Sequence, residues 1–424
     1  MQEAFLHFIW QHQYFDKTGL VTHDGMAVNI IHPGTYNTNA GPDFNEAKVQ
    51  MGNMEWRGHV ELHVKSSDWI QHRHHEDDAY NNVILHVVWH HDHEIRRKDN
   101  TILPTVELQG LIPDDLILSY RKLVNSPFRV PCEQQLKTTR DIIWISTLDK
   151  MVMERLMIKS DGVRELLKKN VQDWEETAYQ LLAKNFGFKI NSEPFLILAQ
   201  NLPYRMLKRH SDHLHQIEAL LFGQAGFLHE QPEDEYQDSL KKEYKFLKHK
   251  YNLQDRLFLH QWKLLRLRPA NFPTVRLAQF ASVIRQLESI CMDFLQLDNI
   301  KQLKSLLKVK QSEYWIKHYQ FGKPVTHKIP CLGDASIENI AINTVVPLMV
   351  AYSQYVDDIQ YTEKAVSLLQ SIKPEINRIS SYWRSLDVEV ATAFDSQALI
   401  QLYNEYCSKR KCLSCNVGVS LIRS

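Results

Sequence analysis

The strongest constraint on the fold of this chain is a change of sequence periodicity part-way along it. Over residues 1–110, short apolar runs alternate with turn residues, as in LVTHDGMAVNIIH, HVELHVK and VILHVVW. Side chains two residues apart share a face of a strand, so these runs predict strands, the last of them covered on both faces. From about Arg140 onward, apolar residues recur at helical spacing, as in IIWISTLDKMVMERLMI. We therefore expect an α+β protein in which a large all-α region follows the strands.

The change of periodicity also predicts where the chain divides. Four prolines lie between residues 104 and 131, and prolines at such density interrupt regular structure. A chain of 424 residues is long enough for more than one hydrophobic core. We predict an α/β domain at residues 1–115, a linker at 116–140 and a mainly helical domain at 141–424 that ends in a cysteine cluster.

The composition predicts a cytoplasmic protein that does not enter a membrane. No apolar run reaches 18 residues, the length that a membrane-spanning helix needs. The first segment, MQEAFLHFIWQHQYFDK, lacks the basic region of a signal peptide and instead has the spacing of an amphipathic helix. Six cysteines in 424 residues do not make a disulfide framework, so we expect reduced thiols.

Charge is unevenly distributed along a chain whose formal net charge is zero. Residues 1–120 hold 17 acidic and 8 basic side chains, whereas residues 241–285 hold 11 basic and only 2 acidic ones. An acidic part followed by a basic helical part is typical of a metal-binding region joined to a region that binds a polyanion. Solvated helix faces produce the same pattern, and the sequence leaves both interpretations open.

Two acidic residues on neighbouring predicted strands form the candidate catalytic site. Asp43 precedes the strand NEAKVQM, and the alternation in the next strand puts Glu61, His63 and Lys65 on one face. Two carboxylates at such positions suit Mg²⁺ or Mn²⁺, which can bind a phosphate oxygen and activate a water molecule. We expect His63 and Lys65 to hold the water or to stabilise the developing charge.

This arrangement resembles the core of the PD-(D/E)xK nucleases, a restriction-endonuclease-like fold. Pro42-Asp43 and Glu61-Leu62-His63 match its motif, with His63 standing where those enzymes have lysine and Lys65 one pleat further along. The resemblance implies the order helix, strands, helix, strand and an acidic residue from the first helix, for which Glu3 is the candidate. It also implies a nuclease or phosphodiesterase that acts on DNA or RNA.

Two other functions, and an ordinary hairpin with a polar outer face, remain open at this stage. The histidine in place of lysine is compatible with a non-catalytic protein that binds nucleic acid on a nuclease-like fold. Nine histidines lie between residues 59 and 93, a density that also suits transition-metal ligands. A zinc hydrolase built from His63, His74 and Asp78 is the resulting third candidate.

The helical part contains two further patterns. In RLRPANFPTVRLAQFA, Arg266, Arg268 and Arg276 flank an aromatic residue, as suits phosphate binding and base stacking, although such arginines also pair with acidic neighbours. Near the end of the chain, three cysteines follow the spacing C-x4-C-x2-C, which suits zinc or an iron–sulfur cluster. These cysteines are Cys407, Cys412 and Cys415. A fourth ligand, Cys132 or Cys331, is available only if the fold brings it near.

Five segments together resemble one bacterial family over nearly the whole chain. They are NAGPDF, RGHVELHVKSSDW, HRHHEDDAYNNVILHVVWHHD, RPANFPTVRLAQFA and CSKRKCLSCNVG. The family is domain of unknown function 2851, common in Bacteroidetes. The resemblance implies a cytoplasmic bacterial protein and carries no activity with it.

Overall fold

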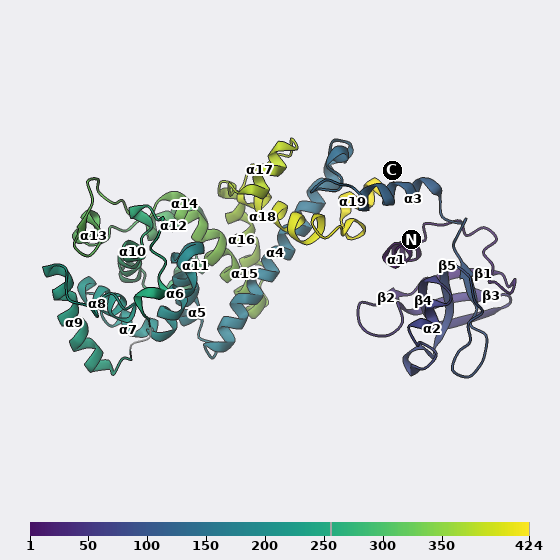
Figure 1. Cartoon of the computed structure of the whole chain (residues 1–424), viewed down its shortest axis with the longest axis horizontal. Coiled ribbons are helices and arrows are strands. Elements are labelled where there is room, and N and C mark those ends of the chain that lie inside the picture. The colour runs from purple at the N-terminus through teal and green to yellow at the C-terminus, as the bar shows by residue number, and fades with distance from the viewer. Residues whose placement is uncertain (255–256, 424) are drawn as a thin grey trace. The chain divides into compact units, whose positions relative to one another are not determined.

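The chain forms two compact units of different secondary structure (Figure 1). The computed structural model describes residues 1–254 and 257–423. Unit 1 comprises Met1–Thr147 and Asn404–Ser424, and unit 2 comprises Leu148–Tyr403. Unit 1 contains a mixed sheet, and unit 2 consists mainly of helices, so the predicted α+β class is confirmed.

The compact units do not follow the predicted boundaries at every point. The predicted linker, residues 116–140, belongs to unit 1 and includes most of α3 (Asp114–Val124) and the short helix η2 (Glu133–Thr138). The segment from Asn404 onward, predicted as the end of the helical domain, returns to unit 1. The division into separately folding domains stays a prediction.

The sheet of unit 1 has six strands, five of which follow one another in the order β1-β3-β4-β5-β6, with β2 beside β3. The strands are β1 (Val28–His32), β2 (Thr35–Tyr36), β3 (Phe44–Met51), β4 (Met54–Lys65), β5 (Val83–His90) and β6 (Thr105–Glu107). β3 and β4 form an antiparallel hairpin through Gly52-Asn53, whereas β4, β5 and β6 run parallel. Because parallel neighbours need a crossover, the chain between β4 and β5 must leave the sheet and return.

That crossover contains the histidine-rich segment. Ser67 precedes the short helix α2 (Asp68–Gln71), and η1 (Asp78–Tyr80) follows it. Trp69 of α2 is buried in a small apolar cluster with Val83, Ile95 and Leu103. This anchor holds the segment from His72 to His75 beside the sheet, because the segment begins three residues after the buried tryptophan.

The central strand β4 is covered on both faces, which corrects one expectation. Val60 and Leu62 are fully buried on one side, as predicted, but Glu61 and His63 on the other side are only 5% and 1% exposed. The helices α1 (Glu3–His12) and α2 both contact β4. The alternative of an ordinary hairpin with a polar outer face does not hold over these two residues, because that face is largely removed from solvent.

Unit 2 is built around a helix that is buried on all sides. The helix α10 (Pro273–Gln286) buries every residue from Pro273 to Ile284, and it contacts α5, α7, α8 and α12. The other helices are α4 (Asp141–Lys169, which begins in unit 1), α5 (Trp174–Phe186), α6 (Phe188–Asn201), α7 (Tyr204–Lys208), α8 (Leu214–Gln224), α9 (Glu235–Tyr251), α11 (Ile290–Leu295), α12 (Ile300–Leu307), α13 (Glu313–Lys317), α14 (Asp334–Ile340), α15 (Val346–Val356), α16 (Gln360–Ser371), α17 (Arg378–Ser385) and α18 (Ala393–Gln401). A two-stranded ribbon, β7 (His318–Gln320) and β8 (Lys323–Pro324), follows α13.

One helical stretch, Asp334–Val356, is long and apolar enough to cross a membrane when judged by length and composition alone. It includes α14 and α15. Within the protein 67% of its most apolar window is buried, and the core helix of a soluble protein passes the same test. The stretch therefore carries little weight as a membrane segment.

Candidate functional site

Asp43 and Glu61 meet where the β3–β4 ladder ends. The backbone N–H of Asp43 donates to Glu61 Oε2 at 3.0 Å, and the backbone N–H of Leu62 donates to Asp43 Oδ2 at 2.9 Å. These two bonds take the place of further ladder bonds beyond the pair Phe44–Val60. The sequence prediction that these two acids lie together thus agrees with the geometry, and backbone donors hold both carboxylates in position.

Burial makes the charged form of Glu61 costly. Removal from water, and then the neighbouring charge of Asp43, raises the pKa of Glu61 to about 8. The Glu61 Oε1 atom lies 3.2 Å from His74 Nε2 and 3.7 Å from His63 Nε2. A buried carboxylate beside a second carboxylate is a site where a bound cation offsets an unfavourable charge.

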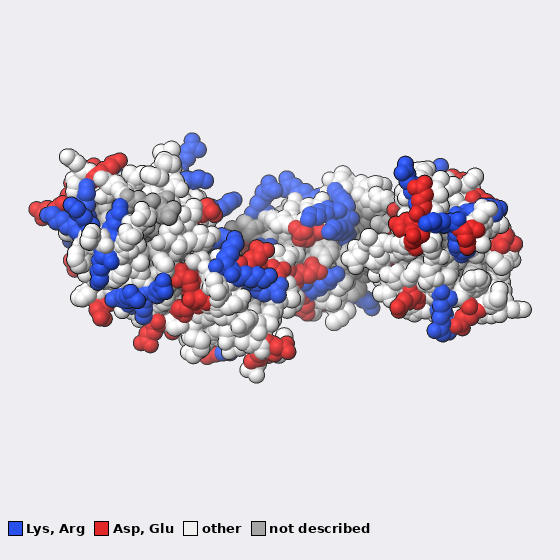
Figure 2. Space-filling model, turned by 90° about the horizontal axis from the view of Figure 1, so that it is seen from below, with Lys and Arg blue, Asp and Glu red and all other residues white. Residues whose placement is uncertain are grey.

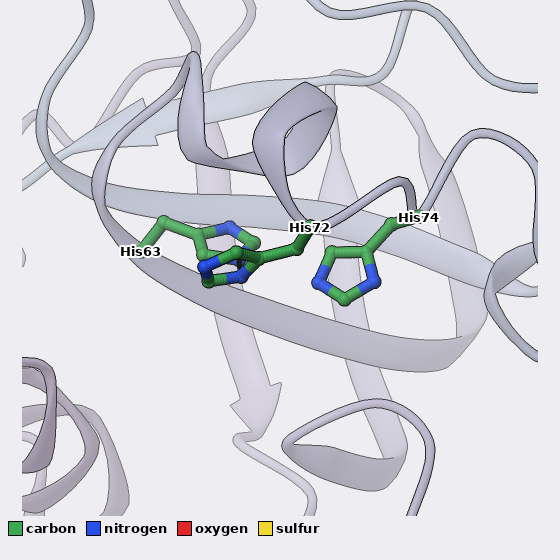
Figure 3. A group of neighbouring side chains, drawn as sticks. All are labelled: His63, His72 and His74. Atoms are coloured by element: carbon green, nitrogen blue, oxygen red, sulfur yellow. Dashed lines mark hydrogen bonds between the residues drawn. The ribbon is translucent and has the colours of Figure 1, made fainter.

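Three imidazoles gather beside Glu61 (Figure 3). One ligand nitrogen from each of His63, His72 and His74 lies within 4.8 Å of the other two. His63 comes from β4, and the other two come from the segment after α2. His63 is buried, His74 is half-buried and His72 is exposed, so the group reaches from the protein interior to solvent. His72 was not among the ligands predicted from the sequence, although it lies in the histidine-rich segment.

The buried imidazoles of this group are held neutral. Burial, followed by the charge of neighbouring histidines, lowers the pKa of His63 to about 2 and that of His86 to about 3. His63 Nδ1 lies 2.8 Å from Nε2 of His86, which comes from β5. When His63 Nδ1 donates its proton to His86, the His63 Nε2 atom is left as an acceptor, the form in which imidazole binds metal. His63 therefore does not supply the positive charge that a lysine would supply at this position.

Two residues of α1 face the acidic pair. His7 Nε2 lies 3.2 Å from Asp43 Oδ2, and burial followed by the charge of Asp43 raises the pKa of Glu3. Burial alone would lower the pKa of His7, but the hydrogen bond and charge of Asp43 outweigh it and raise that pKa. Glu3 was predicted from the sequence, whereas His7 was missed. Its signal is the spacing of four residues from Glu3, which puts both side chains on one helix face.

Two other predicted residues lie outside this group. The side chain of Lys65 is exposed, and within the described residues no contact joins its ammonium group to Asp43 or Glu61. Asp78, the third ligand of the alternative zinc site, is ion-paired with Lys98 at 2.7 Å. The two histidines of that alternative, His63 and His74, do lie together. The third member of their group is His72 and not Asp78.

The three arginines of the predicted nucleic-acid-binding loop do not share one environment. Arg266 and Arg268 are exposed, but Arg276 is 8% exposed because it lies on the buried helix α10. Its guanidinium donates to Asn271 and Gln279, packs over the ring of Phe188 and lines a cavity of about 340 Å³. Arg276 therefore cannot bind a nucleic-acid backbone on the surface, which corrects that assignment.

The predicted cysteine ligands are buried in unit 1. Cys407, Cys412 and Cys415 all carry reduced thiols that are 7% exposed. Of the two candidates for a fourth ligand, Cys132 belongs to the same unit and Cys331 to unit 2.

Comparison with known families assigns the chain to a family, but the description of that family gives no activity. The family described as "Protein of unknown function (DUF2851)" matches residues 3–378, and the chain belongs to this family. The match covers the carboxylate–histidine group and ends before the C-terminal cysteines. No curated protein and no solved structure matches the chain.

Proposed function

We propose that unit 1 is a metal-dependent phosphodiesterase that acts on nucleic acid. The observation that carries the proposal is the convergence of Glu61 with His63, His72 and His74 on one side of β4. Nitrogen and carboxylate ligands together favour a transition metal such as Zn²⁺ or Mn²⁺ over Mg²⁺, which prefers oxygen ligands. Because the ligand set is mixed, we propose Zn²⁺ or Mn²⁺ at this site in place of Mg²⁺.

The residues present fit such an ion. The buried Nε2 atom of His74 lies 3.2 Å from Glu61 Oε1, but the two atoms are not aligned for a hydrogen bond, and Nε2 has no other hydrogen-bond partner among the described residues. His63 has its second ring nitrogen next to His86, the outer contact that orients a metal-bound imidazole. The solvent-facing position of His72 provides a route for substrate. When bound, the ion would acidify a water molecule and polarise a phosphoryl oxygen.

The residues of α1 take the role that lysine has in the nucleases which this motif resembles. His7, ion-paired with Asp43, supplies a positive charge next to the site when it is protonated. From there it would stabilise charge on the phosphoryl oxygens or donate a proton to the leaving oxygen. Asp43 orients His7 and is itself fixed by the N–H of Leu62. Glu3 is a third carboxylate at this site, and its charge contributes to the raised pKa of Glu61.

Nucleic acid is the substrate class favoured by the basic part of the sequence. Within residues 241–285 the aromatic side chains of Phe246 and Phe258 are 63% and 60% exposed, among the basic residues of that stretch. Exposed aromatic rings with lysine and arginine suit base stacking and phosphate contact. On the face drawn in Figure 2, basic and acidic side chains are intermixed, so the proposal does not depend on a continuous basic surface.

Replacement of His72 should remove the bound metal ion, whereas replacement of a neighbouring histidine outside the cluster should not. We expect His72→Ala to lose the metal that copurifies with, or is reloaded into, the wild-type protein, because His72 provides one of the clustered nitrogens. His75→Ala is the matched control, since His75 lies three residues away beside Glu76 and outside the cluster. Elemental analysis after dialysis measures the difference. Equal metal content in His72→Ala and wild-type protein would refute the assignment.

The activity should depend on His7 in a manner separate from metal binding. We expect the protein to cleave labelled DNA or RNA oligonucleotides with Zn²⁺ or Mn²⁺. His7→Gln should lower the turnover by roughly 100-fold, within the range for a lost general acid, while the metal content stays unchanged. Failure of the metal-loaded wild-type protein to cleave single- or double-stranded DNA or RNA would reject the enzymatic proposal.

A nucleic-acid-binding protein without catalysis is the second candidate. The neutral state of His63 and the separation of Lys65 from the acidic pair favour it. In that case binding to an oligonucleotide would weaken steeply with salt, because phosphate contacts release counterions. No turnover would accompany the binding with any divalent metal, and His7→Gln would leave the affinity for metal unchanged.

A further inference from the structure

Cysteines from two distant parts of the chain meet in unit 1. Cys132 follows α3, whereas Cys407, Cys412 and Cys415 lie in the segment that returns from the end of unit 2. The helix α19 (Asn416–Ile422) of the returning segment contacts α3 and the short helix η7 (Cys412–Ser414). Elements that carry or flank all four thiols therefore belong to one packed region.

Hydrogen bonds connect the two segments and shape the turns between the thiols. Arg410 Nη1 donates to the backbone carbonyl of Phe128 at 2.8 Å, which joins the C-x4-C loop to the loop before Cys132. Within the returning segment, the N–H of Cys415 donates to the carbonyl of Cys412 at 3.3 Å. Gly418 packs so closely that a Cβ atom there would lie 2.3 Å from the carbonyl oxygen of Cys412. This contact requires glycine at position 418 and holds Cys412 in place.

The thiols are close enough to oppose one another's ionisation. Burial, and then the neighbouring cysteines, raises the pKa of Cys132, Cys407 and Cys412. Cys132 is influenced by Cys415 and Cys412, and Cys407 by all three others.

The separation of the sulfur atoms speaks against a single zinc ion. A single zinc ion holds its thiolates at about 2.3 Å, so any two of them lie within about 4.6 Å of each other. Among the residues that the structure describes, no three cysteine sulfurs lie within 4.8 Å of one another, although three imidazole nitrogens do. A cluster of several iron ions binds its thiolates on different irons and therefore accommodates a wider set.

We propose that Cys132, Cys407, Cys412 and Cys415 bind an iron–sulfur cluster, with Cys132 as the fourth ligand of the C-x4-C-x2-C motif. The cluster lies in the same unit as the carboxylate–histidine group but uses none of its residues. Its role is to tie the end of the chain to α3 and the loop after it. The proposal is independent of the phosphodiesterase, because neither the ligands nor the metal is shared.

The experiment uses the full chain, expressed with iron supplementation and purified without oxygen. We expect iron and acid-labile sulfide in equal amounts, with visible absorbance that is lost on oxidation. Cys132→Ser should reduce both contents to background, whereas Cys331→Ser, a cysteine of unit 2, should leave them unchanged. Sulfide separates the cluster from iron bound by histidines, because an imidazole site contains none. Circular dichroism of each variant establishes whether its helices have formed.

Two results would overturn the cluster. One is stoichiometric zinc without sulfide in the wild-type protein, which would mean that the thiols rotate to close on a single ion. The other is equal iron and sulfide in folded Cys132→Ser and wild-type protein, which would remove Cys132 from the ligand set. If Cys132→Ser does not fold, Cys415→Ser provides the same comparison at the opposite segment.

Discussion

Glu61→Gln should abolish metal binding at the carboxylate–histidine group and, in the metal-free protein, increase stability. Glutamine keeps the shape of the side chain and an oxygen that can accept the N–H of Asp43, but it has no charge to offer a cation. Replacement of a residue that only supports a metal ligand costs about 10–100-fold in affinity, so loss of a direct ligand should exceed roughly 100-fold. Calorimetric titration of the chelator-treated protein with Zn²⁺ and Mn²⁺ measures this loss.

The stability gain follows from the direction of the Glu61 pKa shift. Because the folded-state pKa is raised from 4.5 to about 8, the folded protein binds more protons than the unfolded chain between these values. Stability contributed by Glu61 is therefore lost as pH rises through that window. Glutamine does not titrate, so near neutral pH the metal-free variant should be more stable by about 1 to 3 kcal/mol, at about 1.4 kcal/mol per pKa unit. Urea unfolding measures the difference.

Glu55→Gln provides the matched control on the same strand. Glu55 also lies on β4, but its carboxylate is exposed and ion-paired with Lys48 at 3.0 Å. An exposed pair contributes little, so this variant should leave both stability and metal affinity close to those of the wild-type protein. Wild-type metal affinity in Glu61→Gln would exclude Glu61 from the metal site.

The second large effect concerns the dependence of stability on pH in the metal-free protein. His63 and His86 have folded-state pKa values of about 2 and about 3, far below their ordinary value. Below pH 6.5 the unfolded chain takes up protons that these folded imidazoles do not, so stability falls as pH falls. Glu61 acts in the opposite direction over the same range, because its folded carboxyl group takes up a proton first.

We therefore expect acid sensitivity that Glu61 partly masks. Between about pH 7 and about pH 5, Glu61→Gln should lose stability faster than the wild-type protein by up to about 1.4 kcal/mol per pH unit, the contribution of one proton. His63→Asn should lose stability more slowly than wild type, because it removes an acid-sensitive imidazole. The raised pKa of His7 and the lowered pKa of His74 also oppose each other, but they are common to all three proteins.

Urea unfolding at several pH values, with chelator present throughout, measures these slopes. His93→Gln is the control, since His93 is exposed and outside the group. Identical slopes for wild-type protein, Glu61→Gln and His63→Asn would contradict the account of charge at this site.

Local patterns in the sequence were sufficient to predict much of unit 1. The runs NEAKVQM and HVELHVK predicted the neighbouring strands β3 and β4, and the continuous run VILHVVW predicted the covered strand β5. The same alternation put Glu61 and His63 on one face of β4. These predictions succeed because hairpin register and the pleat depend on residues that are near one another in the chain.

What the sequence did not predict depends on contacts between distant segments. Alternation indicates which residues share a face, but not that α1 and α2 would cover the polar face of β4. His7 enters the site only because α1 lies beside β4, and His72 only because Trp69 anchors the crossover. Arg276 was assigned to a surface because a loop motif says nothing about which following helix is central.

The discontinuous composition of unit 1 has a consequence for synthesis of the protein. Its last segment, from Asn404, emerges from the ribosome only after all of Leu148–Tyr403 has been made. At about 5–20 residues per second, that interval is on the order of 10 to 50 seconds. A nascent or truncated chain can thus contain every histidine and carboxylate of β4 and α1 while unit 1 lacks its final helix. Synthesis of the segment from Asn404 onward is then the event that completes unit 1.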